Sequence, residues 1–214
     1  MPEIRSVPEP GQTLNTGDKE AVPRQAASVI LLRGGAETLE VLLVKRTEKA
    51  KFMAGVWVFP GGGVDAHEGE GDAAHRRAAV RELVEEAGVT LADAAGSELV
   101  KFSQWITPAE VKIRFDTHFF LASMPAGQEV VIDGEECVDH GWFSPQAALD
   151  AHTGGQILLV FPTIKHLEQL APFATADELL AYAAGRTVQP VQPRVVMTGE
   201  TARVVLPGEP GYDD

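Results

Sequence analysis

Three glutamates, Glu82, Glu85 and Glu86, gather within five residues of a segment rich in helix-forming residues. Their positions are i, i+3 and i+4, so a helix carries all three on one face. Carboxylates grouped in this way repel one another unless a cation lies between them, and oxygen-only ligands suit hard divalent ions such as Mg²⁺ or Mn²⁺. From spacing alone, the alternative is a solvated acidic face that binds no metal.

The helix that positions these glutamates is predicted over residues 72–87. Asp72 is a candidate N-cap, alanines and a leucine fill the interior, and Gly88 follows where a left-handed residue often ends a helix. His75, near the start of this helix, is expected to be exposed.

The segment Arg81–Val89 resembles the second half of the Nudix box, which reads Arg-Glu-U-x-Glu-Glu-x-Gly-U with U aliphatic. All seven specified positions match: Arg81, Glu82, Leu83, Glu85, Glu86, Gly88 and Val89. The preceding segment Trp57–Gly62 is similar to the strand and loop before that box. The chain is identified as a member of the Nudix superfamily. Membership implies an α+β fold, an α/β/α sandwich with a mixed sheet between helices, and Mg²⁺ or Mn²⁺ bound by the three glutamates.

The first half of the box departs from the family pattern of Gly, five residues, Glu, seven residues, Arg. Counting back from Arg81 places Ala73 where the glutamate is expected. If Gly62 is the glycine of the pattern, five extra residues precede the arginine. Either Glu68 or Glu70 then stands in for the missing glutamate, and the sequence does not choose between them.

An interrupted box resembles the Nudix branch that includes peroxisomal and mitochondrial coenzyme A diphosphatases, some of which carry an insertion at this place. Further likeness to that branch lies in residues 105–108, 114–120, 142–145, 162–163 and 206–208. The resemblance implies hydrolysis of the diphosphate of CoA or acyl-CoA by water attack at phosphorus. Two alternatives stay open: hydrolysis of ADP-ribose, NADH or another nucleoside diphosphate sugar, and a non-catalytic Nudix domain that binds nucleotide.

The other expected site residues stand at strand ends and in loops. Arg81 is expected to pair with a neighbouring carboxylate and orient it rather than touch substrate. Glu136, in the loop before a strand predicted over 138–143, is the candidate proton acceptor, with a solvated turn as the alternative. Arginine suits phosphate because its planar fork donates two parallel hydrogen bonds. Five residues are candidates for binding the substrate: Arg46, Arg114, Gly61, Gly62 and Phe59.

Strand and helix patterns are interspersed without strict alternation, which favours a mixed sheet covered by helices. Strands are predicted over residues 26–33, 40–46, 56–59, 99–105, 114–122 and 138–143, the first two as a hairpin. Pro60–Gly63 predicts a turn. Extra C-terminal elements follow: a helix after Ser144-Pro145, helices over 162–170 and 176–184, and a hairpin over 193–208. Thr175 and Glu178 predict a capping box.

The chain of 214 residues is 44% hydrophobic and 23% charged, which suits one globular domain. Residues 1–24 are rich in Pro, Gly and charge and predict a flexible tail. Residues 25–208 are expected to form a single Nudix hydrolase domain, followed by a loose C-terminus over 209–214.

Eighteen basic and thirty-one acidic residues give a net charge of −13, which argues against nucleic-acid binding and leaves a small nucleotide as the expected partner. No apolar run approaches the ~20 residues of a membrane span, and the N-terminal segment lacks the apolar core of a secretory signal. A cytoplasmic location without membrane contact is therefore expected. Cys137 is the single cysteine and is expected to be a buried bystander. The oligomeric state is not readable, and a homodimer is one expectation.

Overall fold

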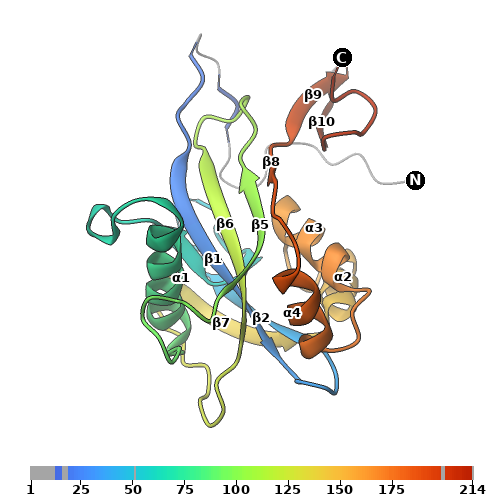
Figure 1. The fold of residues 1–214 in the computed structure, drawn as a ribbon. Helices are drawn as coiled ribbons and strands as arrows, with labels where there is room; N and C mark the ends of the chain where they lie inside the picture. The colour runs from blue at the N-terminus through green and yellow to red at the C-terminus, as the bar shows by residue number, and fades with distance from the viewer. Residues whose placement is uncertain (1–12, 16–18, 51, 199–200, 214) are drawn as a thin grey trace.

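A mixed β-sheet forms the centre of the computed structural model, which describes residues 13–15, 19–50, 52–198 and 201–213 (Figure 1). Within these residues the sheet has eight strands in the order β3-β2-β1-β6-β5-β8, with β4 paired to β1 and β7 paired to β2. The strands are β1 (Arg24–Arg33), β2 (Glu40–Arg46), β3 (Trp57–Val58), β4 (Gly61–Gly63), β5 (Val100–Ile106), β6 (Phe115–Ser123), β7 (Cys137–Phe143) and β8 (Pro190–Val191).

The predicted strands are confirmed to within a few residues at their ends. The expected hairpin of the first two strands forms at its closed end, where Leu32 pairs with Val41 and Arg33 with Glu40. β1 also pairs with β6 in parallel along most of its length. This parallel pairing makes the sheet mixed, as the pattern of elements predicts.

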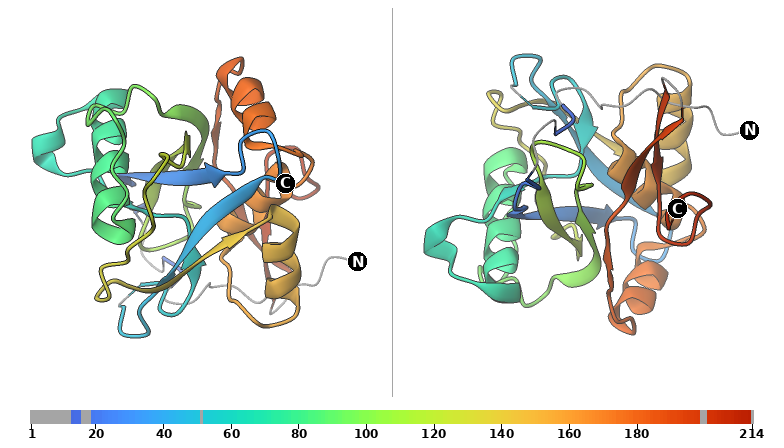
Figure 2. Two further views of the ribbon diagram at one scale, coloured as in Figure 1. Left: turned by 90° about the horizontal axis from the view of Figure 1, so that it is seen from below. Right: turned by 90° about the horizontal axis from the view of Figure 1, so that it is seen from above.

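Helices cover both faces of the sheet (Figures 1 and 2). One face carries α1 (Gly71–Ala87), preceded by a short 3₁₀ helix, η1 (Ala66–Glu68). The other face carries α2 (Pro145–Thr153), α3 (Phe161–Leu170) and α4 (Ala176–Ala184). Side chains of β1 alternate between the two layers, because successive strand residues point to opposite faces: Val29 packs in the cluster with α1, and Ile30 packs in the cluster with the C-terminal helices. The α/β/α sandwich is confirmed.

The predicted span of helix α1 is confirmed, but the residue predicted to cap its N-terminus is not the N-cap. Gly88 ends the helix in the left-handed region with φ 65°. Asp72 as N-cap is wrong: the helix begins at Gly71 after Glu70, and Asp72 accepts a hydrogen bond from Arg76 at 2.7 Å. The expected exposure of His75 is also wrong. Its ring is only 5% exposed and stacks on the ring of His118 with centroids 3.7 Å apart, because this side of the helix packs on the sheet.

The turn predicted at Pro60–Gly63 is wrong over its glycines, which form strand β4 and pair antiparallel with β1. The reason is close backbone approach. A Cβ at Gly61 would lie 2.7 Å from Ser28 Cα, so a side chain there would clash. Glycine therefore permits a strand where its usual role in turns predicts a reversal.

The extra C-terminal helices and hairpin are confirmed. Ser144 caps α2 by accepting the N–H of Ala147. Thr175 caps α4 in the same way, but the reciprocal half of the predicted capping box is shifted by one residue, since Glu178 accepts from the N–H of Ala174. The final hairpin pairs β9 (Arg194–Thr198) with β10 (Thr201–Val205), and residues 199 and 200 of its turn lie outside the described residues.

The described parts of both terminal segments contact the domain. Leu14 forms an isolated bridge with Val111, while residues 1–12 and 16–18 of the expected tail lie outside the described residues. Near the other end, the Tyr212 hydroxyl donates to the carbonyl of Gln192. The domain boundaries near 25 and 208 stay a prediction. No helix in the described part of the chain is both long and apolar enough to cross a membrane.

Candidate active site

Glu86 is the most buried of the three glutamates, with 3% of its surface exposed. The N–H of Gly61 donates to its Oε2 at 2.9 Å, and Arg46 Nη1 lies 3.5 Å from its Oε1. Burial raises the pKa of Glu86 to about 7, and the negative charges of Glu82 and Glu136 act in the same direction. The hydrogen bond from Gly61 and the charge of Arg46 oppose this rise.

Arg81 connects several carboxylates, as the sequence predicts for at least one of them. Its Nη1 donates to Glu82 Oε1 at 2.7 Å and to Glu85 Oε2 at 2.9 Å. Its Nε donates to Glu68 Oε1 at 3.0 Å, and its Nη2 donates to the carbonyl of Gly63 at 2.8 Å. The guanidinium therefore lies between the helix, the η1 segment and β4, and it orients carboxylates on two of them.

Of the two candidates for the first glutamate of the box, Glu68 lies beside Arg81. Glu68 is 4% exposed, and besides its ion pair with Arg81 its Oε2 accepts the N–H of Asp65 at 2.7 Å. Glu70 is exposed at the N-cap of α1. Glu68 has the regular spacing from Gly62, so the five extra residues lie between Glu68 and Arg81, and the fold still places the two side chains together.

The three glutamates share a side of α1 but differ in environment. Glu82 is largely buried against β4, so closely that a Cβ at Gly62 would clash with its carboxylate. Burial raises the pKa of Glu82, while the ion pair with Arg81 opposes the rise. The Glu85 side chain is 56% exposed. The helical spacing does not reveal this asymmetry, which comes from β4 covering one edge of the helix face.

Glu136 stands in a loop that folds around Asp133. The carboxylate of Asp133 accepts the backbone N–H groups of Glu135, Glu136 and Cys137 at 2.6–3.1 Å, which fixes the loop. The negative charge of Glu136 adds to the causes that raise the pKa of Glu82 and of Glu86. Cys137 is fully buried, as expected, and burial raises its pKa well above the ordinary range.

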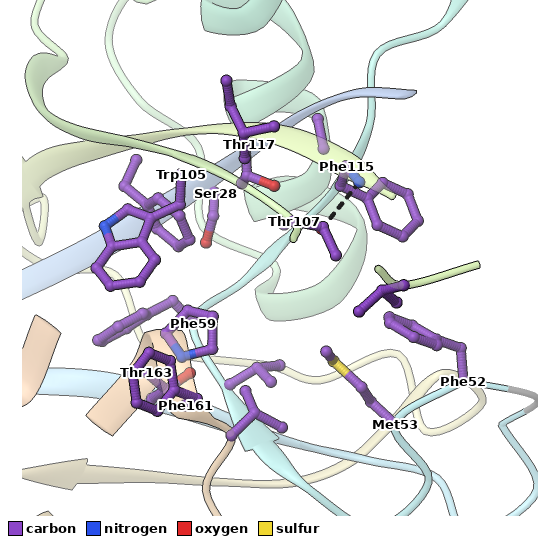
Figure 3. Close-up of a pocket in the computed structure, with 18 of the residues that line it drawn as sticks. Ser28, Phe52, Met53, Phe59, Trp105, Thr107, Phe115, Thr117, Phe161 and Thr163 are labelled. Carbon is purple, nitrogen blue, oxygen red and sulfur yellow. Dashed lines mark hydrogen bonds between the residues drawn. The ribbon is translucent and has the colours of Figure 1, made fainter. Parts of the chain in front are cut away.

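A cavity of about 320 Å³ opens on the side of β4 away from α1 (Figure 3). Gly61–Gly63 and Arg46 line the part nearest the carboxylates, and apolar side chains line most of the rest. Figure 3 shows two groups of them facing each other across the cavity. One group holds Phe59, Trp105 and Phe161, and the other holds Phe52, Met53 and Phe115.

Of the five expected substrate-binding residues, Arg46, Gly61, Gly62 and Phe59 line this cavity. Arg114 does not. It is 3% exposed, forms an ion pair with Glu20, and donates to the carbonyls of Ala21 and Thr107. The structure therefore places Arg114 as an anchor for the segment before β1, outside the lining of this cavity.

Several cavity residues are absent from the sequence-based candidates. Phe52 and Met53 stand in the loop after β2, Phe161 begins α3, and Val195 and Val204 come from the C-terminal hairpin. Met53 has a positive φ of 55°, which is unusual for a residue other than glycine and is not predicted by the local sequence. None of these five residues belongs to a motif. They line one cavity because the loop after β2, helix α3 and the C-terminal hairpin, which are far apart in the sequence, pack together in the fold.

The NUDIX domain family model matches residues 22–160, more than half of the chain. This chain belongs to the Nudix hydrolase family. A putative nudix hydrolase 7 of Caenorhabditis elegans is 29% identical over 89% of this chain and 75% of that protein. The acyl-coenzyme A diphosphatase NUDT19 of Homo sapiens is 30% identical over 53% of this chain and 32% of that protein. The chain thus matches about a third of the length of that relative.

Solved Nudix structures share the fold. A Nudix hydrolase from Alicyclobacillus acidocaldarius superposes with a TM-score of 0.67 at 24% identity, covering 75% of this chain and 96% of that one. The Nudix domain of Shewanella oneidensis NrtR, solved with ADP-ribose, superposes with a TM-score of 0.52 at 21% identity, covering 70% and 86%. These likenesses support the fold assignment.

Nudix hydrolases generally use divalent metal ions, and the donor set of this Nudix domain fits one. Burial raises the pKa of Glu82 and of Glu86, and the positive charges of Arg81 and Arg46 offset this rise only in part. A cation supplies further positive charge. No group of three His, Cys, Asp or Glu side chains in the described ranges is already arranged to hold an ion. Arg81 donates to one oxygen of Glu82 and one oxygen of Glu85, so it can orient both carboxylates while the second oxygen of each faces an ion.

Proposed function

We propose that this Nudix hydrolase is a diphosphatase that cleaves CoA or acyl-CoA in the presence of Mg²⁺ or Mn²⁺. Water attacks phosphorus, the bond between the bridging oxygen and that phosphorus breaks, and the products are 3′,5′-ADP and a phosphopantetheine or its acyl ester. The observation that carries the proposal is the apolar cavity lined in part by Arg46 and Gly61, both of which also contact the buried Glu86.

This cavity favours a substrate that carries an apolar group, such as the acyl chain of an acyl-CoA, over one with a second sugar. A sugar presents hydroxyl groups that must be hydrogen-bonded when buried, since each unpaired polar group costs roughly 1–3 kcal/mol. The described cavity wall offers mostly aliphatic and aromatic carbon instead. The likeness to an acyl-coenzyme A diphosphatase supports the same choice.

In the proposed reaction, some residues bind the metal ion and others hold the metal-binding carboxylates in position. Glu82, Glu85 and Glu86 hold the divalent ion, which when bound neutralises charge on the diphosphate and lowers the pKa of the attacking water. Arg81 positions Glu82, Glu85 and Glu68, and Gly61 positions Glu86.

Substrate contact and proton removal fall to residues at the edge of the cavity. Arg46 lies beside Glu86 and lines the cavity, so its guanidinium donates to a phosphate oxygen of the substrate. Glu136, on the fixed loop before β7, accepts the proton of the attacking water.

A substrate panel tests the proposal. Purified protein with Mg²⁺ or Mn²⁺ is compared on CoA, an acyl-CoA, ADP-ribose, NADH and a diadenosine polyphosphate by kcat/KM, with chelated protein as the control. The proposal requires kcat/KM to be highest for CoA or acyl-CoA and to vanish on chelation. Higher values for ADP-ribose or NADH would assign the site to nucleoside diphosphate sugars. Tight nucleotide binding with no turnover of any compound would identify a non-catalytic binding domain.

A further inference from the structure

The far wall of the cavity is built by the C-terminal hairpin. Val195 of β9 and Val204 of β10 line it together with Val111. The two hairpin valines are direct cross-strand partners, so their side chains share one face of the hairpin, and both line the cavity. The match to the Nudix family model ends at residue 160, so this wall lies outside the region that the model covers.

The C-terminal hairpin is held to the rest of the domain by several contacts. β8 pairs in parallel with β5 through Val191 and Trp105, and the N–H of Val195 donates to Glu110 Oε2 at 3.2 Å. Val195 also packs with Val111 in a small buried cluster. Figure 1 shows β8 alongside β5 with the hairpin beyond it. Because these contacts fix the hairpin in place, the wall that Val195 and Val204 form limits the depth of the cavity.

The chemistry of the cavity wall indicates what fills it. Four lining residues carry hydroxyls, and two of these are engaged by backbone groups: Ser28 donates to the carbonyl of Pro60, and Thr107 accepts the N–H of Phe115. A nucleobase brings polar edges that need partners when buried, and few groups remain here to supply them. A hydrocarbon chain needs none.

We infer that the C-terminal hairpin is the acyl-selectivity element of this enzyme: Val195 and Val204 close the cavity around the apolar chain of an acyl-CoA and limit its length. The inference rests on the proposed function and adds the residues that read the acyl group. Each further pair of methylenes that the cavity buries is expected to raise kcat/KM roughly tenfold, and the gain stops where the chain meets the two valines.

The test compares Val195→Trp and Val204→Trp with Val196→Trp, a matched control on the neighbouring residue, which alternates to the opposite face and does not line the cavity. The readout is the ratio of kcat/KM for decanoyl-CoA to that for CoA. We expect this ratio to fall at least about tenfold in the two cavity variants and to stay within about twofold of wild type in the control. Val204→Ala, which deepens the cavity, shifts the preference towards dodecanoyl-CoA.

Binding of decanoyl-pantetheine, measured by calorimetry, separates this inference from the proposed function, because the compound contains no nucleotide. Saturable binding that Val195→Trp weakens and Val196→Trp does not supports the inference even if CoA proves not to be hydrolysed. Unchanged chain-length ratios in Val195→Trp, Val204→Trp and Val204→Ala, with all variants folded by thermal melting, would overturn it. Absence of decanoyl-pantetheine binding to the wild-type protein would overturn it as well.

Discussion

Arg81 and Glu68 form an ion pair across thirteen residues of sequence, with the arginine Nε 3.0 Å from the carboxylate Oε1. Glu68 stands six residues after Gly62, so the five extra residues of the box lie between Glu68 and Arg81. The same guanidinium holds Glu82 and Glu85. The fold therefore keeps a buried carboxylate beside the arginine despite the longer spacing.

This relationship predicts that Glu68→Gln lowers kcat/KM by about 10–100-fold, the usual cost of removing a group that orients metal ligands. Arg81 loses one of its three charged partners and holds Glu82 and Glu85 less firmly in place. Glu70→Gln is the matched control, since Glu70 is exposed two residues away and is expected to stay within about twofold of wild type. Equal losses in both variants would contradict the assignment of Glu68. Steady-state kinetics at saturating metal gives the comparison.

Metal binding is expected to stabilise the folded protein. At a metal concentration about a hundred times Kd, the linkage contributes about 2.7 kcal/mol, which raises Tm by roughly 5–10 °C for a chain of this size. Thermal melts with Mn²⁺, Mg²⁺ or chelator measure the shift. Glu86→Gln should abolish most of it, whereas Glu168→Gln on α3, an exposed carboxylate paired with Lys165, should retain it. A full shift in Glu86→Gln would exclude Glu86 from the metal site.

Arg46 is expected to contact the substrate through its fork. Arg46→Lys keeps a positive charge near Glu86 but removes the planar donor pair, so KM should rise about tenfold or more while kcat falls less. Arg33→Lys, which alters an exposed ion pair with Glu40, is the control and should leave both constants unchanged. If Arg46→Lys lowers kcat alone, Arg46 acts on Glu86 and not on substrate.

His166 makes stability depend on pH in a known direction. It is fully buried in α3 with its Nε2 2.6 Å from Ser103 Oγ, and burial lowers its pKa to about 4 from an ordinary value near 6.5. Because the unfolded chain binds the proton more readily, stability contributed by the neutral ring is full above pH 6.5 and is lost as the pH falls towards 4.

Between pH 7 and pH 5 this histidine alone should remove about 2 kcal/mol from the free energy of unfolding. Urea titrations of the wild-type protein and of the double variant His166→Leu with Ser103→Ala measure the loss, and the double variant leaves no unpaired hydroxyl. The wild-type protein should lose about 2 kcal/mol more than the variant over this range. The same pH dependence in both proteins would show that His166 does not stay neutral in the fold.

Local sequence predicts the elements of this fold well, because helix periodicity, caps and strand alternation are properties of neighbouring residues. Helix α1 and the termination at Gly88 follow from such signals. The strand at Gly61–Gly63 and the burial of His75 do not, because both depend on contacts with β1 and β6 that are far away in sequence. The position of Arg114 depends in the same way on Glu20.

In the candidate site, too, some features follow from local sequence and others from contacts between distant segments. The spacing of Glu82, Glu85 and Glu86 is a local property and places them on one side of a helix. Which of them is buried depends on β4, and the wall formed by Val195 and Val204 depends on a hairpin more than a hundred residues from the box. Motifs therefore identify the carboxylates, and tertiary packing identifies the cavity.

The most direct test of the central claim is hydrolysis of CoA by the wild-type protein and by Glu86→Gln with Mn²⁺, followed by identification of the nucleotide product. Since Glu86 helps to supply charge stabilisation worth several kcal/mol in the transition state, the variant should lose at least about a hundredfold in kcat. The proposed mechanism predicts 3′,5′-ADP from the wild-type protein, none with chelator, and this loss in Glu86→Gln. Formation of 3′,5′-ADP at an equal rate by both proteins, or by neither, would contradict it.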